Sequence, residues 1–163
     1  AALAGGLEQA IGALRSMREQ EGESLARDIT GRLVAIEALT EAIKARTPLT
    51  VEQARKRMSE AVEKVLKDPP EPARLAQEIA ILAERTDVTE EITRLASHMG
   101  QFRAMVRAAG AEPVGRKLDF LIQEMGREVN TIASKALDAE ISLQVVTIKA
   151  ELEKIREQVQ NIE

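Results

Sequence analysis

The sequence contains no cysteine, tryptophan or tyrosine, and these absences exclude several kinds of chemistry. Without cysteine the chain forms neither disulfides nor thiolate metal sites, and it offers no thiol nucleophile. A reducing cytoplasm is the simplest setting for such a chain. Aromatic residues are limited to Phe102 and Phe120. Proteins that read single-stranded bases usually stack them on aromatic rings, so we expect only backbone and guanidinium contacts to any nucleic acid, with little sequence preference.

Long apolar runs are also absent, since no stretch approaches the roughly 20 residues that span a bilayer. There is no signal-peptide pattern, and we expect no membrane partner. The chain has no initiator methionine, and "AALAGGLEQAIGAL" opens in the middle of a helical pattern. We therefore expect residues 1–163 to be a single helical domain that belongs to a longer protein.

The charge of the chain is unevenly distributed. The net charge is −4 with 31% charged residues, which does not by itself indicate a nucleic-acid-binding protein. Residues 101–135 nevertheless carry six basic residues against four acidic ones, whereas residues 136–163 carry three against six. Arginine outnumbers lysine by 15 to 8, and arginine is the better bidentate partner for phosphate. Such a surface could hold RNA locally.

Apolar residues recur every three or four positions through almost the whole chain, and strand signals are absent. This spacing predicts an all-α bundle of long, mostly antiparallel helices with coiled-coil character. Within residues 1–68 we expect a helical hairpin. The segment "RTPLT" ends the first helix, and Thr50 caps the second. Gly22 weakens the middle of the first helix. "KDPPEP" at residues 67–72 separates this hairpin from the motif-bearing helices of residues 73–163.

Four helices are predicted after that break. A short one covers about 73–84, Thr86 and Asp87 are typical caps for the next, and a third covers about 115–135. The last has a heptad seam with alternating spacings of four and three, which could pack inside the bundle or against another copy. Its seam residues are Ile141, Val145, Ile148, Leu152, Ile155, Val159 and Ile162.

The helix over 115–135 carries Arg, Asp, Gln and Asn where a solvated helix usually carries Glu and Lys. Its predicted buried face comprises Leu118, Leu121, Ile122, Met125, Val129 and Ile132. The opposite band comprises Arg116, Asp119, Gln123, Arg127, Asn130 and Ser134. Glu124, Glu128 and Lys135 form a second band along one flank, where the two glutamates lie one turn apart.

Two interpretations of these bands stay open on the pattern alone. One is a hydrogen-bonded network between helices or subunits. The other is a surface on which Arg binds phosphate, carboxylates hold Mg²⁺ or Mn²⁺, and Gln or Asn orients water. His98, the only histidine, either lines the edge of the core or transfers protons near neutral pH. No P-loop, dinucleotide-binding, zinc-protease or nucleophile-elbow motif is present.

Several segments resemble the C-terminal region of the YicC/YloC proteins, a bacterial family of endoribonucleases. They are "EEITRLASHMGQFR", "VGRKLDFLIQEMGREVNTIASKALDAEI" and "IKAELEKIREQVQNIE", and "EGESLARDI" near the start also fits. The resemblance covers nearly the whole chain. It implies that the complete protein has a further N-terminal domain, and that family members form hexamers. It also implies that RNA enters a central cavity and is cut with the help of a divalent metal.

Many positions of this chain match the motifs of that family. They are His98, Gly115, Arg116, Asp119, Gln123, Glu124, Arg127, Glu128, Asn130, Thr131, Ser134, Lys135 and Glu140, and in the tail Arg156, Glu157, Gln158, Gln160 and Asn161. Gly126 and Leu137 depart from the pattern, since the family tends to have Asn at both places. The loss of two amides beside the candidate site weakens the expectation that water or metal is held there as in relatives.

The resemblance leads to the hypothesis of a metal-assisted endoribonuclease with little sequence specificity and no small-molecule cofactor. The proposed catalytic residues are His98, Glu124 and Glu128. The proposed RNA-binding residues are Arg116, Gln123, Arg127, Asn130 and Lys135. The proposed ligands for Mg²⁺ or Mn²⁺ are Asp119, Glu124, Glu128 and Glu140. The alternatives are a non-catalytic helical scaffold for oligomerisation and an RNA-binding adaptor that does not cleave.

Overall fold

The computed structural model of the chain describes residues 2–65, 72–108 and 114–160. In these ranges the chain is built from α-helices and contains no strand, which confirms the predicted all-α bundle. The helices are α1 (Ala2–Val65), α2 (Pro72–Thr86), α3 (Thr89–Ala108), α4 (Gly115–Lys135) and α5 (Ala139–Gln160). None of these described helices is long and apolar enough to cross a membrane.

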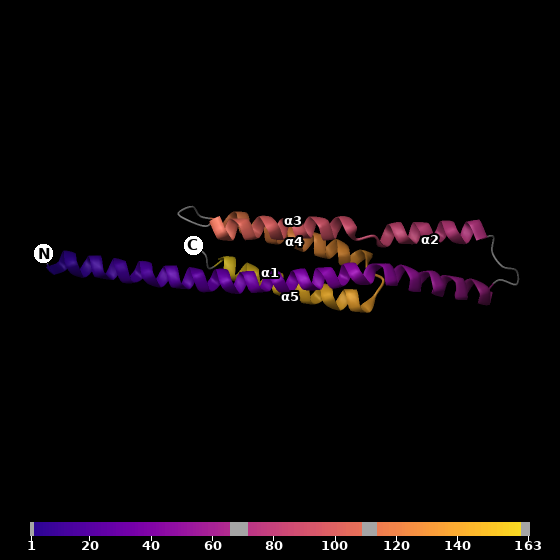
Figure 1. Cartoon of the computed structure of the whole chain (residues 1–163), viewed down its shortest axis with the longest axis horizontal. Coiled ribbons are helices and arrows are strands. Elements are labelled where there is room, and N and C mark those ends of the chain that lie inside the picture. The colour runs from indigo at the N-terminus through magenta and orange to yellow at the C-terminus, as the bar shows by residue number, and fades with distance from the viewer. Residues whose placement is uncertain (1, 66–71, 109–113, 161–163) are drawn as a thin grey trace.

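The helices run up and down along one long axis (Figure 1). α2 and α3 return along α1 nearly in line with each other, α4 turns back beside α3, and α5 returns beside α1. α5 packs against both α4 and α1, so it joins the α3–α4 hairpin to the long first helix.

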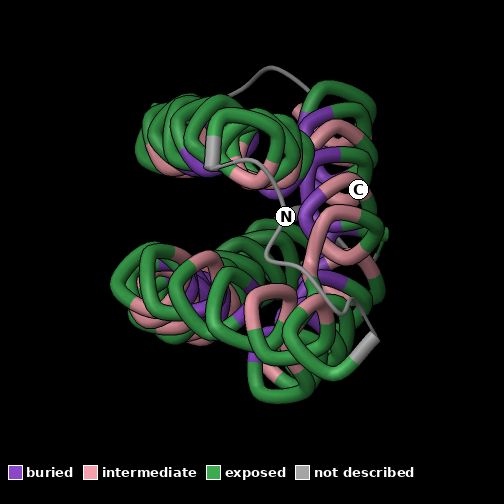
Figure 2. Tube along the Cα trace, turned by 90° about the vertical axis from the view of Figure 1, so that its right-hand side faces the viewer, coloured by how far each residue is buried: buried purple, intermediate pink, exposed green. Residues whose placement is uncertain are grey.

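The core lies where α1, α3, α4 and α5 face one another, and Figure 2 shows the buried segments turned inward. The α5 seam is buried within this bundle through Ile141, Val145, Ile148, Leu152, Ile155 and Val159. Ile162 lies outside the described residues. Each buried aliphatic side chain contributes about 1.5 to 3 kcal/mol. A partly exposed ion pair such as Arg32–Glu151, at 2.8 Å, adds about 0.2 to 1 kcal/mol. Apolar packing therefore decides where α5 lies.

α1 continues without a break through Gly22 and Pro48, so the predicted hairpin within residues 1–68 is wrong. A glycine costs a helix about 1 kcal/mol and a proline about 3 kcal/mol relative to alanine. Burial on both sides of the proline outweighs this cost, since Ile43 is fully buried and Ala54 is 9% exposed. Packing of an apolar face against neighbouring helices overrode the local signals.

Two threonine hydroxyls lie beside the proline in the continuous helix. Pro48 has no N–H, so it cannot make the usual bond to the carbonyl four residues earlier. The Thr47 hydroxyl donates to the Ile43 carbonyl at 2.9 Å, and the Thr50 hydroxyl donates to the Thr47 carbonyl at 2.8 Å. Thr50 is therefore an interior helical residue and not the predicted cap.

The first part of α1 extends beyond the other helices (Figure 1), and residues 5–24 are all exposed. Three of its large exposed apolar side chains lie on the face of α1 that becomes buried from Ile29 onward, namely Leu7, Ile11 and Leu14. These side chains form an apolar surface that the described part of this chain does not cover.

The junction of α2 and α3 agrees with its predicted caps. α2 ends at Thr86, two residues later than expected, and α3 begins at Thr89. Asp87 Oδ1 accepts a hydrogen bond from the Thr89 amide at 2.9 Å. Hydrogen bonds from Thr89 lower the pKa of Asp87, because they favour the ionised carboxylate.

We expect Pro48→Ala to raise the free energy of unfolding by about 1 to 3 kcal/mol, because alanine restores the missing N–H and removes the ring from the helix. Gly31→Ala is the matched control in the same helix. A Cβ there meets nothing within 4 Å, and its gain is limited to about 1 kcal/mol. Urea unfolding followed by circular dichroism measures both. A loss of stability in Pro48→Ala would show that the bundle requires the backbone geometry of proline.

Candidate active surface on the α3–α4 hairpin

α4 has the bounds predicted for the helix over 115–135, and its predicted apolar face is buried. Those buried residues are Leu118, Leu121, Ile122, Met125, Val129 and Ile132. Glu128 is also buried, at 8% exposure, although the pattern of a single helix placed it on a flank with Glu124. α3 packs against α4 on that flank. The helical pattern of α4 alone cannot predict which of its flank residues α3 covers.

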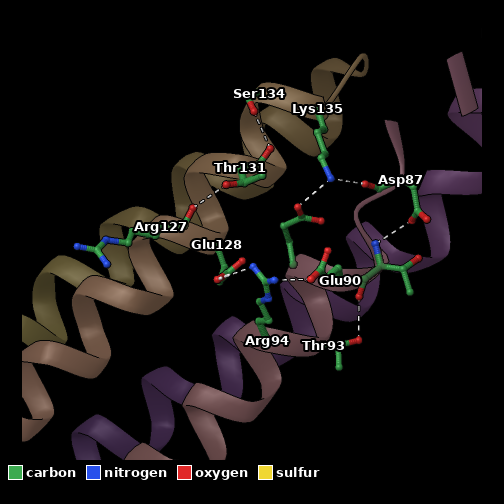
Figure 3. A network of polar contacts seen from close by, with 11 residues as sticks. Asp87, Glu90, Thr93, Arg94, Arg127, Glu128, Thr131, Ser134 and Lys135 are labelled. Carbon is green, nitrogen blue, oxygen red and sulfur yellow. Dashed lines mark hydrogen bonds and ion pairs between the residues drawn. The ribbon is translucent and has the colours of Figure 1, made fainter. Parts of the chain in front are cut away.

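Two ion pairs fix the register of α3 against α4 (Figure 3). Lys135 Nζ lies 2.8 Å from Glu91 Oε1 and also donates to the Asp87 carbonyl at 2.8 Å. Two turns earlier in α4, Glu128 Oε1 lies 3.9 Å from Arg94 Nη1. Glu91 is 5% exposed, so its carboxylate is removed from most solvent. The antiparallel pairing of these helices follows directly from these contacts.

By the helical repeat, the next turn of this register sets the position of His98 level with that of Glu124. His98 is half-buried, and its Nδ1 is buried without a hydrogen-bond partner among the described residues. Glu124 is also half-buried and accepts a hydrogen bond from Arg127 Nη1 at 2.5 Å. The three predicted catalytic residues therefore follow one edge of the α3–α4 hairpin.

The band on the far side of α4 is divided between solvent and α5. Asp119 Oδ2 accepts a hydrogen bond from Gln123 Nε2 at 2.7 Å, and Asp119 Oδ1 accepts one from Arg156 Nε of α5 at 3.2 Å. Arg116 and Asn130 are exposed. Asp119 thus contributes to an interhelical contact, whereas the two exposed residues are accessible to a ligand.

Glu140 lies at the opposite end of α5 from the partner of Asp119. Glu140 lies at the start of α5, and its Oε2 is 2.5 Å from Arg46 Nη1 of α1. Arg156 lies near the end of α5. At a rise of 1.5 Å per residue, the two positions are about 24 Å apart along the axis. Asp119 and Glu140 therefore cannot hold the same metal ion within one chain.

The four predicted metal ligands do not converge in this chain. Among the described residues, no three His, Asp or Glu side chains lie close enough together to hold a metal ion. Each carboxylate instead faces a guanidinium group of the same chain. The pairs are Asp119–Arg156, Glu124–Arg127, Glu128–Arg94 and Glu140–Arg46. Within the described residues of one chain, the four predicted ligands therefore do not form a single metal site.

Sequence analysis missed Glu91, Arg94 and Asp138. Glu91 and Arg94 acquire their roles from a neighbouring helix, which no pattern within α3 indicates. Asp138 had a signal, because an aspartate directly before an apolar-periodic run is a typical N-cap. Its Oδ1 accepts hydrogen bonds from the amides of Glu140 at 2.9 Å and Ile141 at 3.1 Å.

Asp138 also ties the start of α5 to α1. Its two carboxylate oxygens accept hydrogen bonds from Arg46 Nε at 2.7 Å and Arg46 Nη2 at 3.0 Å. The bond from Arg46, followed by those from the amides at the start of α5, lowers the pKa of Asp138 to about 2. This carboxylate therefore stays ionised until strongly acidic pH.

Comparison with known proteins finds relatives over most of the chain. Residues 43–163 match the family described as "Endoribonuclease YicC-like, C-terminal". A protein of Clostridioides difficile (strain 630) named "Probable endoribonuclease YicC" is 45% identical over 159 residues, which cover 96% of this chain and 54% of that protein. A protein of the same name from Haemophilus influenzae is 39% identical over 148 residues, which cover 91% of this chain and 50% of that protein. The chain thus spans about half the length of these relatives.

We expect Lys135→Met to destabilise the bundle by about 1 to 3 kcal/mol, because it leaves the buried Glu91 carboxylate without its cation. The double variant Glu91→Leu/Lys135→Met removes both charges and should recover much of that loss. A double-mutant cycle by urea unfolding measures the coupling. Additive effects of the two substitutions would show that the pair is not stabilising and leave Lys135 available for RNA.

Stability should depend on pH through Asp138. Its pKa is lowered from 3.8 to about 2 in the folded chain, so its contribution is complete above about pH 4 and is lost as the pH falls toward 2. Arg46→Gln removes the main cause and should reduce the drop in melting temperature between pH 4 and pH 2. Lys56→Gln, which removes only the exposed pair with Glu60 inside α1, is the control. An unchanged acid profile in Arg46→Gln would contradict this assignment.

Proposed function

Because this chain belongs to the endoribonuclease YicC-like family, we propose that it forms the helical half of an endoribonuclease and carries the groups that cleave RNA. The observation that supports this most is the alignment of His98, Glu124 and Glu128 along one edge of the α3–α4 hairpin. An imidazole and two carboxylates in neighbouring turns are suited to proton transfer. Both carboxylates are also engaged in ion pairs, Glu124 with Arg127 and Glu128 with Arg94.

The proposed chemistry is hydrolysis of a phosphodiester. The attacking water loses a proton as its oxygen approaches phosphorus, and the leaving ribose oxygen gains one. We assign these transfers to His98 and Glu124, because helical spacing sets Glu124 level with His98 in the register of α3 against α4. His98 Nδ1 is buried, so Nε2 is the ring nitrogen assigned to the transfer. Arg127, whose side chain is 71% exposed, binds the negatively charged phosphate beside Glu124. Glu128 holds Arg94 in place at this edge.

A requirement for Mg²⁺ or Mn²⁺ is a separate part of the proposal. The ligands that the sequence suggested are distributed over both ends of the bundle and are paired with arginines. A divalent cation would take its remaining ligands from water, from RNA phosphate, from another copy of the chain or from the rest of the full-length protein. Cleavage that persists in EDTA would remove the metal from the proposal and leave the acid–base groups in it.

We propose that the protein works as a homo-oligomer in the cytoplasm, with the hexamer that the family resemblance implies. The uncovered apolar stripe of α1 supports an oligomer, because contiguous exposed apolar surface usually marks an interface. The stripe comprises Leu7, Ile11 and Leu14. The rival function is a scaffold or RNA adaptor that does not cleave. The dense ion pairing within the hairpin favours that rival.

Cleavage of a labelled single-stranded RNA by the full-length protein, resolved on a denaturing gel, tests the proposal. Glu124→Gln and His98→Asn should each lower the cleavage rate by about 10²- to 10⁴-fold, the usual contribution of a general acid or base. Glu153→Gln on the exposed side of α5 is the matched control and should cleave normally. Light scattering after size exclusion follows the oligomer.

Four results separate the candidates. Lost cleavage with normal RNA affinity and an intact oligomer assigns catalysis to this hairpin. Loss of the oligomer in Glu124→Gln indicates that the hairpin is a scaffold for assembly. Normal cleavage by both variants places the chemistry elsewhere and refutes the proposal, whereas RNA binding without any cleavage by the parent protein indicates an adaptor.

A further inference from the structure

Phe120 is 57% exposed, in contrast to Phe102, which is fully buried. It borders a shallow hollow of about 290 Å³ between α3 and α4. The hollow is lined by Gln101 and Met105 from α3 and by Arg116, Lys117, Phe120 and Leu121 from α4. The chain therefore presents an aromatic ring beside two cations, which the small number of aromatic residues had not led us to expect.

The cations at this hollow differ from most others in the hairpin. α3 and α4 contain seven Arg and Lys residues, and four of them are in ion pairs, namely Arg94, Arg103, Arg127 and Lys135. Arg116 and Lys117 are exposed and have no ion-pair partner within the described ranges. The first turn of α4 also contains no acidic residue. This end of α4 therefore carries positive charge that the described chain does not neutralise.

We propose that Phe120, Arg116 and Lys117 bind one unstacked nucleotide of single-stranded RNA. The base stacks on the Phe120 ring and fills the hollow against Met105 and Leu121, while the adjoining phosphates bind the two cations. The helical spacing supports this arrangement, because positions 116 and 117 lie one turn before position 120 and share its side of the helix. Contacts of this kind accept any base, since every base has a flat aromatic face.

Charge complementarity favours a nucleotide over a protein as the occupant. An apolar protein surface placed here would bury two cations without partners, which is costly. A nucleotide supplies both a flat apolar base and an anionic phosphate. Glu124 follows Phe120 by one further turn, so RNA held at this site continues toward the His98–Glu124 edge. The inference rests on the proposed function and adds a substrate-binding subsite to it.

The test measures binding of a short 2′-O-methyl oligoadenylate to the full-length protein by fluorescence anisotropy, and a gel verifies that the probe stays intact. Phe120→Ala should weaken binding by about 5- to 100-fold, the usual effect of removing one stacked aromatic ring. Phe120→Trp should retain affinity. Leu143→Ala is the control, because Leu143 is a similarly exposed apolar residue on α5. A 2-aminopurine in the probe should be quenched by the parent and less by Phe120→Ala.

The salt dependence of RNA binding tests Arg116 and Lys117 separately from Phe120. The double variant Arg116→Gln/Lys117→Gln should lower the slope of log affinity against log salt by about 1.4, which corresponds to two phosphate contacts on a single strand. Lys149→Gln on the exposed side of α5 is the charge-matched control and should leave the slope nearly unchanged. An equal slope in the double variant and the parent would overturn the phosphate contacts.

The failures of the two proposals are distinguishable. If the parent binds the probe and Phe120→Ala binds it equally well, the subsite is refuted while the ribonuclease proposal stands. If Phe120→Ala changes the oligomer and not the RNA affinity, Phe120 is a protein contact and the inference is wrong. If the parent binds neither this probe nor unmodified RNA, both proposals are overturned.

Discussion

The apolar seam of α5 packs against α4 on one side and α1 on the other, and this double contact holds the described bundle together. α3 and α4 are consecutive helices that form a hairpin. α1 contacts this hairpin at α3 and is also joined to it by α5. Ion pairs such as Arg46–Asp138 and Arg32–Glu151 add to this packing between α1 and α5.

The elements that were predicted correctly have strong periodic patterns. α4 and the α5 seam could be read from sequence because their apolar residues repeat at the helical period and a neighbouring element covers that face. The continuity of α1 could not be predicted in this way. Proline and glycine indicate a break locally, and the packing that overrides this signal comes from helices distant in the sequence. The first part of α1 carries the same apolar spacing as the buried part, yet it is exposed.

The sequence predicted which residue types belong to the candidate site, but not how these residues are arranged in space. Helical spacing grouped the polar residues of α4, but it could not show that Glu128 is buried beneath α3 or that Asp119 reaches Arg156. Glu140 was assigned to the same metal site by resemblance alone, and the length of α5 separates it from Asp119. Phe120 was noted from the sequence only as one of two aromatic residues. Its exposure beside two cations that have no ion-pair partner in the described ranges is what supports the proposed stacking role.

The pairing of α1 with α5 has a consequence for synthesis on the ribosome. Arg46 and Asp138 are 92 residues apart in sequence, so the face of α1 that packs against α5 stays uncovered until the last helix has emerged. At about 5 to 20 residues per second, this interval lasts roughly 5 to 20 s. The α3–α4 hairpin can close within that time, because its contacts are local. During that interval the nascent α1 exposes apolar residues to chaperones and to other nascent chains.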